Sequence, residues 1–258
     1  MKENSLIYHR ISQHLSNVLA SYSRIEANEN FVSHDITGIL KDLNATFPDC
    51  NFTLLKNKKN PEDSFIIKCK IFDDKACCIK IYDECWPSAA SFLDDPERRL
   101  MGALAKDKVF PPIHESITTA VTTQDGSSAG SRVVIYDYVD AVDIGTYIKE
   151  DVTRYDECKQ LLVGLIVGLI KNHKVTIMLK DPSGIYVVQG DGGRKRLMMT
   201  DTNHIRSAPH AGEMAIDGRV RKADELAEKF LQKTLVGKKI YTKRHEERSS
   251  QPQPWQKI

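Results

Sequence analysis

The spacing of apolar residues changes twice along this chain, and that change limits the folds it can adopt. In residues 1–50 apolar side chains recur every three or four positions, as at Ile7, Ile11 and Leu15, which is typical of amphipathic helices. From residue 52 to 82, short runs rich in β-branched and aromatic residues alternate with turn residues, which predicts an antiparallel meander of strands. A helix around residues 97–104 and a further pair of strands, ending at residue 138, are predicted next. Helical spacing returns after residue 143. The sequence therefore predicts an α+β fold.

The longest apolar run, residues 161–170, lies within a helix predicted at 155–173. Its ten residues are half of what a membrane span needs, so we expect a buried core helix and no membrane partner. A hairpin is predicted at residues 184–200, followed by one helix at 218–235. The glycine-rich turn of this hairpin, residues 190–193, stands between two strands, which favours a plain turn over a phosphate-binding loop.

Charge and cysteine content exclude several classes of function. The 37 Lys and Arg residues nearly balance the 35 Asp and Glu residues, and a formal charge of +2 gives no reason to expect a nucleic-acid partner. The six cysteines form no CxxC pair, and no His/Cys spacing is typical of zinc sites. No charged-then-apolar signal segment follows Met1. We therefore expect an intracellular protein, cytoplasmic or nuclear, with reduced and mostly buried thiols.

Two short motifs carry side chains suited to phosphate chemistry. Residues 77–80, Cys-Cys-Ile-Lys, lie within the strand predicted at 76–82, and the ammonium of Lys80 can neutralise phosphate oxygens. Asp201 follows the apolar strand of residues 197–199 and places a carboxylate at its end.

The order of elements over about residues 52–235, together with these motifs, resembles the protein-kinase-like superfamily. The resemblance implies a two-lobed fold with a strand-rich first lobe at 51–140 and a minimal, mostly helical second lobe at 141–237. Residues 1–50 would form a helical N-terminal extension, and residues 238–258 a basic, mobile tail.

In the first lobe, residues 77–80 resemble the family's Val-Ala-Ile-Lys strand, so Lys80 would contact the nucleotide phosphates. Glu97 stands where a helix glutamate pairs with that lysine. Tyr136 and Tyr138 lie in a segment similar to the hinge, whose backbone would bind an adenine edge. The resemblance thus implies ATP as a cofactor, with Lys80 and Glu97 in catalytic roles.

In the second lobe, Lys180-Asp181 resembles the Arg-Asp pair of the catalytic loop, so Asp181 would be the base that accepts the substrate hydroxyl proton. Asp201 stands at the aspartate of the Asp-Phe-Gly motif and would be the magnesium ligand.

Three departures from the family pattern leave the function open. No Gly-x-Gly-x-x-Gly loop lies between the first two strands, the metal-binding asparagine is replaced around residues 184–186, and no Ala-Pro-Glu motif appears. The first hypothesis is an atypical ATP- and magnesium-dependent kinase acting on a protein hydroxyl. The alternative is an inactive pseudokinase that serves as a scaffold for a protein partner. A third is an unrelated α+β interaction protein.

Overall fold

The computed structural model describes residues 2–25, 32–56, 64–71, 75–86, 96–122, 128–179, 184–201, 205–207 and 212–235. The chain divides into two compact units. Unit 1 comprises Met1–Ala105 and Pro111–Val139, and unit 2 comprises Lys106–Phe110 and Asp140–Ile258. Both contain helices and antiparallel strands, so the α+β fold predicted from the sequence is confirmed.

Unit 1 is built on a five-stranded antiparallel sheet in the order β3-β4-β5-β7-β6. Its strands are β3 (Asn51–Lys56), β4 (Ser64–Lys70), β5 (Ala76–Trp86), β6 (Ile113–Thr122) and β7 (Ser128–Asp137). A short separate ladder joins β1 (Ser23–Ile25) to β2 (Val32–His34).

The meander predicted for residues 52–82 is confirmed in β3, β4 and β5, and of the further pair of strands β7 lies next to β5 while β6 takes the edge. The reason is the composition of the two last strands. The segment of β7 from Val133 to Tyr136 is buried throughout, whereas β6 carries a threonine-rich segment that is partly exposed. The apolar strand therefore takes the central position and the polar one the edge.

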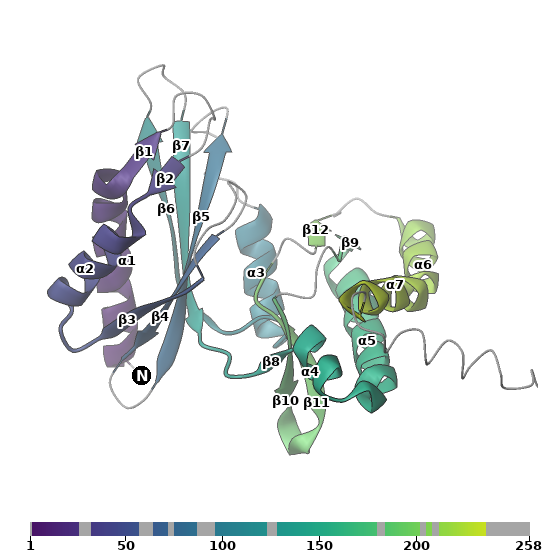
Figure 1. Cartoon of the computed structure of the whole chain (residues 1–258). Helices are drawn as coiled ribbons and strands as arrows, with labels where there is room; N and C mark the ends of the chain where they lie inside the picture. The colour runs from purple at the N-terminus through teal and green to yellow at the C-terminus, as the bar shows by residue number, and fades with distance from the viewer. Residues whose placement is uncertain are drawn as a thin grey trace, which may run out of the picture. The chain divides into compact units, whose positions relative to one another are not determined.

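Three helices flank this sheet: α1 (Lys2–Tyr22), α2 (Ile36–Thr46) and α3 (Pro96–Lys106). In Figure 1, α1 and α2 lie on one side of the sheet and α3 lies toward the other. The helical stripe predicted from the sequence is confirmed, because Ile11, Leu15, Ile39 and Leu43 are buried in one core with the sheet. The two N-terminal helices therefore share the core of unit 1.

Unit 2 is mostly helical. Its helices are α4 (Ile144–Glu150), the 3-10 turn η2 (Val152–Arg154), α5 (Tyr155–His173), α6 (Glu213–Arg221) and α7 (Ala223–Leu235). A three-stranded sheet has the order β11-β10-β8, formed by β8 (Val142–Asp143), β10 (Ile185–Gln189) and β11 (Lys195–Met199). A second ladder pairs β9 (Val175–Ile177) with β12 (Ile205–Ser207).

Helix α5 matches the bounds predicted for the long apolar helix and packs against α6, α7, β9 and β11. The plain hairpin is also confirmed, because β10 and β11 pair from Ile185↔Met199 to Gln189↔Lys195 around the turn η3 (Asp191–Gly193). The single helix predicted at 218–235 is wrong. Two helices meet there at Lys222, whose backbone N–H bonds back to Arg219 and Val220 and ends α6.

Residues 238–258, expected as a mobile tail, lie outside the described residues. Across the parts of the chain that the structure describes, no helix combines the length and the apolar character needed to cross a bilayer. The structure describes the side chains of five of the six cysteines, and all five are buried free thiols.

Candidate functional site

The two faces of the unit 1 sheet differ in chemistry, and Lys80 lies on the face away from α1 and α2. Successive side chains of a strand point to opposite faces. Cys77, Ile79 and Ile81 belong to the core shared with α1 and α2, whereas Cys78 and Lys80 alternate with them and do not. We call the face that carries Cys78 and Lys80 the lysine face.

Lys80 is only 2% exposed, and it is flanked across the ladder by Ile66 of β4 and Val134 of β7. Removing an ammonium from water costs several kcal/mol unless anionic or polar groups surround it. Other polar or anionic groups must therefore compensate the loss of hydration of this buried ammonium. This is an unusual place for a lysine with no role beyond solubility.

The lysine face also carries Cys78, paired across the ladder with Lys68 and Tyr136. Burial raises the pKa of the Cys78 thiol to about 11, against opposing effects of a Tyr136 hydrogen bond and of the charges on Lys68 and Lys80. The thiol is therefore protonated at neutral pH and is a poor nucleophile. The chemistry available on this face is cationic rather than thiol-based.

The two tyrosines expected near an adenine occupy different environments. The Tyr136 side chain is 2% exposed and hydrogen-bonds to Cys78, so it is part of the core. The Lys68 ammonium lies 3.7 Å from the centre of the Tyr138 ring, a cation–π contact. The Tyr138 backbone N–H donates to the carbonyl of Ala76 over 3.0 Å. Both residues therefore have structural partners of their own within unit 1.

Glu97 lies in the first turn of α3, as the sequence predicted, but its side chain is outside the described parts of the structure. The ion pair expected between Glu97 and Lys80 stays a prediction.

Sequence reasoning missed Arg132. It lies on β7 two residues before Val134, on the lysine face, and it is 4% exposed. Among the described residues, Lys80 and Arg132 are the two charged side chains that are buried, and the ladder makes them diagonal neighbours. An arginine directly before the apolar run that begins at Val133 was the signal that could have identified it. Two buried cations give this face a strong preference for anionic groups.

In unit 2, Asp201 is held at the end of the hairpin. The Thr200 backbone N–H donates to the Gly184 carbonyl over 2.8 Å, which extends the β10–β11 ladder to the residue before Asp201. Gly184 has φ +86°, and a Cβ built there would lie 2.9 Å from the Cβ of Asp201. Only glycine fits this position without displacing the aspartate.

We expect Gly184→Ala to lower the free energy of unfolding by about 2–4 kcal/mol, because it adds backbone strain and a clash with Asp201. Gly192 is the matched control. It also has a positive φ, of +70°, but a Cβ built there would meet nothing within 4 Å. Gly192→Ala should therefore lower the free energy of unfolding by about 1 kcal/mol, because it adds backbone strain alone. Urea unfolding of both variants measures the difference, and equal losses would contradict the close approach of Gly184 to Asp201.

The strands that flank Asp201 pair with the strands that flank the predicted position of Asp181. Residues 178–184 lead from β9 to β10, and residues 200–204 lead from β11 to β12. The end of β9 pairs with the start of β12 (Ile177↔Ile205), and the start of β10 pairs with the end of β11 (Ile185↔Met199). The two connections therefore begin and end at strand residues that are paired with each other. Asp181 itself lies outside the described residues.

The predicted site residues thus fall into two groups. Lys80, Glu97, Tyr136 and Tyr138 belong to unit 1, and Asp201 belongs to unit 2. Within unit 1 the structure brings Lys80 and Tyr136 to the same face of the sheet.

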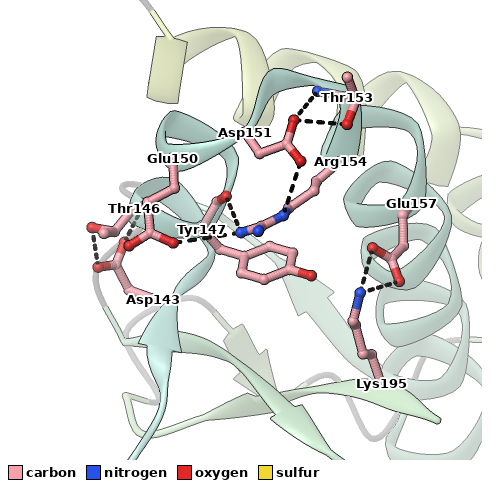
Figure 2. A network of polar contacts seen from close by, with 9 residues as sticks. All are labelled: Asp143, Thr146, Tyr147, Glu150, Asp151, Thr153, Arg154, Glu157 and Lys195. Carbon is pink, nitrogen blue, oxygen red and sulfur yellow. Dashed lines mark hydrogen bonds and ion pairs between the residues drawn. The ribbon is translucent and has the colours of Figure 1, made fainter.

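A second polar cluster in unit 2 is structural (Figure 2). Arg154 stacks over the Tyr147 ring at 4.3 Å and forms a 3.4 Å ion pair with Asp151. Asp151 caps η2 through Thr153, and Lys195 forms a 3.0 Å ion pair with Glu157. These groups are paired with one another and fix the corner between α4 and α5. Such exposed pairs stabilise a fold by about 0–1 kcal/mol each and do not indicate catalysis.

Magnesium is the metal that the sequence resemblance implies. Within the described ranges, no group of three His, Cys, Asp or Glu side chains could hold a metal ion. Mg²⁺ in nucleotide sites often uses one or two carboxylates together with the substrate phosphates. Asp201, half-buried at the end of a strand, fits that limited requirement.

Comparison with known proteins assigns no family: no family model matches the chain, and no curated protein matches it.

Proposed function

We propose that the chain is a divergent protein-kinase-like phosphotransferase that binds ATP with magnesium and phosphorylates a protein hydroxyl. The observation that carries this proposal is the pairing, in unit 2, of the strands that bound residues 178–184 and residues 200–204. Ile177, just before the first connection, pairs with Ile205, just after the second. Ile185 and Met199, at the opposite ends, pair in the same way. A base on the first and a metal ligand on the second would therefore act in one small region, although 20 positions separate Asp181 from Asp201 in the sequence.

The roles follow from the chemistry of phosphoryl transfer, which depends on positioning and on neutralising phosphate charge. Asp181 accepts the proton of the attacking hydroxyl. The hydroxyl oxygen then bonds to the γ-phosphorus while the bond to the ADP oxygen breaks. Asp201 is the carboxylate that would hold magnesium, which supplies charge neutralisation on the phosphates when it is bound.

The lysine face of unit 1 supports the phosphate-binding part of this proposal. Lys80 is in a central strand, and Arg132 adds a second cation to the same face. Glu97, in the first turn of α3, is the acid that we expect to orient Lys80.

A scaffold without catalysis is the second candidate, and the burial of Lys80 favours it. An ammonium that is 2% exposed has to become accessible before it can contact a phosphate. The missing glycine loop and the missing metal-binding asparagine point the same way. In this alternative the kinase-like fold serves to bind a protein partner.

Thermal unfolding with and without ATP and magnesium separates these candidates. A ligand at a hundred times its Kd stabilises a protein by about 2.7 kcal/mol, so millimolar ATP should raise the Tm by several degrees. Lys80→Met keeps the apolar stem but removes the charge, and we expect it to abolish the ATP-dependent shift. Lys70→Met on the neighbouring strand is the control, because Lys70 is exposed. If the Tm of the wild-type protein does not change with ATP in the presence of magnesium or of manganese, the phosphotransferase proposal is wrong.

A further inference from the structure

Three side chains from separate elements of unit 1 form a continuous contact that ends at Asp137, the last residue of β7. The Tyr8 ring of α1 stacks on the His114 ring of β6, with centroids 4.1 Å apart and an angle of 7° between the planes. The His114 Nε2 lies 2.6 Å from Oδ1 of Asp137. Helix α1 is thereby connected through one imidazole to the strand end from which the chain leaves unit 1 after Val139.

The backbone around Asp137 is held from both neighbouring strands as well. The Asp137 N–H donates to the Pro112 carbonyl over 3.0 Å, next to β6. The Tyr138 N–H donates to Ala76 at the start of β5 over the same distance. The side-chain contacts therefore add to a backbone segment that is already anchored on two sides. Of the amides at positions 137–139, this leaves that of Val139 as the one for an incoming ligand to use.

The surroundings favour a stable contact between Tyr8 and His114. Burial, together with the nearby Cys77 and Asp137, raises the pKa of Tyr8 to about 12, so the phenol stays neutral. The adjacent pair of His9 and Glu115, 3.5 Å apart, joins the same two elements, α1 and β6. Tyr8 is buried, and the His114 side chain is 24% exposed. The ring of His114 is therefore held on one side by an aromatic ring and at its Nε2 by a carboxylate.

We propose that His114 and Tyr8 are positioning residues, which fix the backbone of residues 137–139 for hydrogen bonding to the base of a bound adenine nucleotide. The inference rests on the proposed function, since it assigns the base-binding segment of the same site. It makes helix α1 part of the nucleotide site without direct contact. His114 acts through Asp137, and Tyr8 acts by holding the His114 ring.

Two substitutions of His114 separate its two contacts. His114→Phe keeps an aromatic ring to stack on Tyr8 but removes the bond to Asp137. His114→Gln loses the ring but places an amide nitrogen where Nε2 lies, so it can still donate to Asp137. If positioning depends on Asp137, His114→Phe should weaken ATP binding about tenfold, the effect of a misplaced hydrogen bond. His114→Gln should bind ATP within about twofold of wild type.

Binding of adenosine, measured by calorimetry beside ATP, tests whether the base contact is the one affected. His114→Phe should weaken adenosine and ATP by the same factor, because the base is common to both. A larger loss for ATP than for adenosine would place the effect at the phosphates and overturn the inference. Unchanged ATP binding in His114→Phe would overturn it as well.

Hydrogen exchange at the Tyr138 amide distinguishes failure of this inference from failure of the proposed function. A wild-type protein that binds neither ATP nor adenosine would refute the nucleotide site. Even then, His114→Phe should speed exchange at Tyr138 about tenfold and His114→Gln should not, if the contact fixes this backbone. Equal exchange in all three proteins would show that His114 positions nothing.

Discussion

Ile166→Asp is expected to unfold unit 2. Ile166 is in the middle of α5, is 0% exposed, and packs in the core that α5 forms with α7 and β11. A carboxylate there loses the packing of the isoleucine, about 2–5 kcal/mol, and adds an unpaired buried charge worth about 3–5 kcal/mol. The sum is comparable to the whole stability of a domain, roughly 5–15 kcal/mol. Circular dichroism and the yield of folded protein measure the result.

The neighbouring position provides the control. Val167 is half-buried, and Gly164 on the same side of the helix is exposed, so an aspartate at 167 can reach water. Val167→Asp should therefore lower the free energy of unfolding by about 1–2 kcal/mol and leave the fold intact. Two equally stable variants would show that α5 is not the centre of unit 2.

Elements with a strong internal period could be predicted from the sequence. The stripe through Ile11 and Leu15 identified α1, and the bounds of α5 agree with its apolar pattern. Local rules were sufficient because each of these helices buries one face over many residues. The hairpin β10–β11 followed equally well from turn residues between two apolar strands.

Elements that depend on partners far away in the chain were not predictable in the same way. Strands β9 and β12 have three residues each and exist because they pair with each other across nearly 30 positions. The break between α6 and α7 at Lys222 has no glycine or proline to mark it. The central position of β7 also depends on how the strands pack against the rest of the core, and the local spacing of apolar residues does not determine that.

The residues of the candidate site likewise fall into those that short motifs identify and those that only long-range pairing reveals. Lys80 and Asp201 were identified from short motifs, since each stands beside an apolar strand. The burial of Lys80 beside Arg132 is visible only when β5 and β7 are paired. The contact of Tyr8 with His114 joins residues more than 100 positions apart, which no spacing rule could connect.

Isosteric amides at the two aspartates of unit 2 should separate the enzyme from the scaffold. Asp201→Asn and Asp181→Asn keep side-chain size but remove the charge. If the chain transfers phosphate, each variant should lower the rate by at least about a hundredfold, including any autophosphorylation. Radiolabelled phosphate transfer measures this. Asp217→Asn on the exposed side of α6 is the control and should be fully active.

Nucleotide binding gives the two variants different signatures. Asp201→Asn should weaken ATP binding in the presence of magnesium, because it removes a metal ligand, and should have little effect in its absence. Asp181→Asn should bind ATP as wild type does, because the base acts on the acceptor hydroxyl and not on the nucleotide. The scaffold predicts no transfer by the wild-type protein and partner binding that survives both substitutions. Full activity of Asp181→Asn would remove that residue from the mechanism while leaving Asp201 and Lys80 in place. The pairing of β9 with β12 and of β10 with β11 brings the ends of the two connections together, but it does not define which side chain is the base.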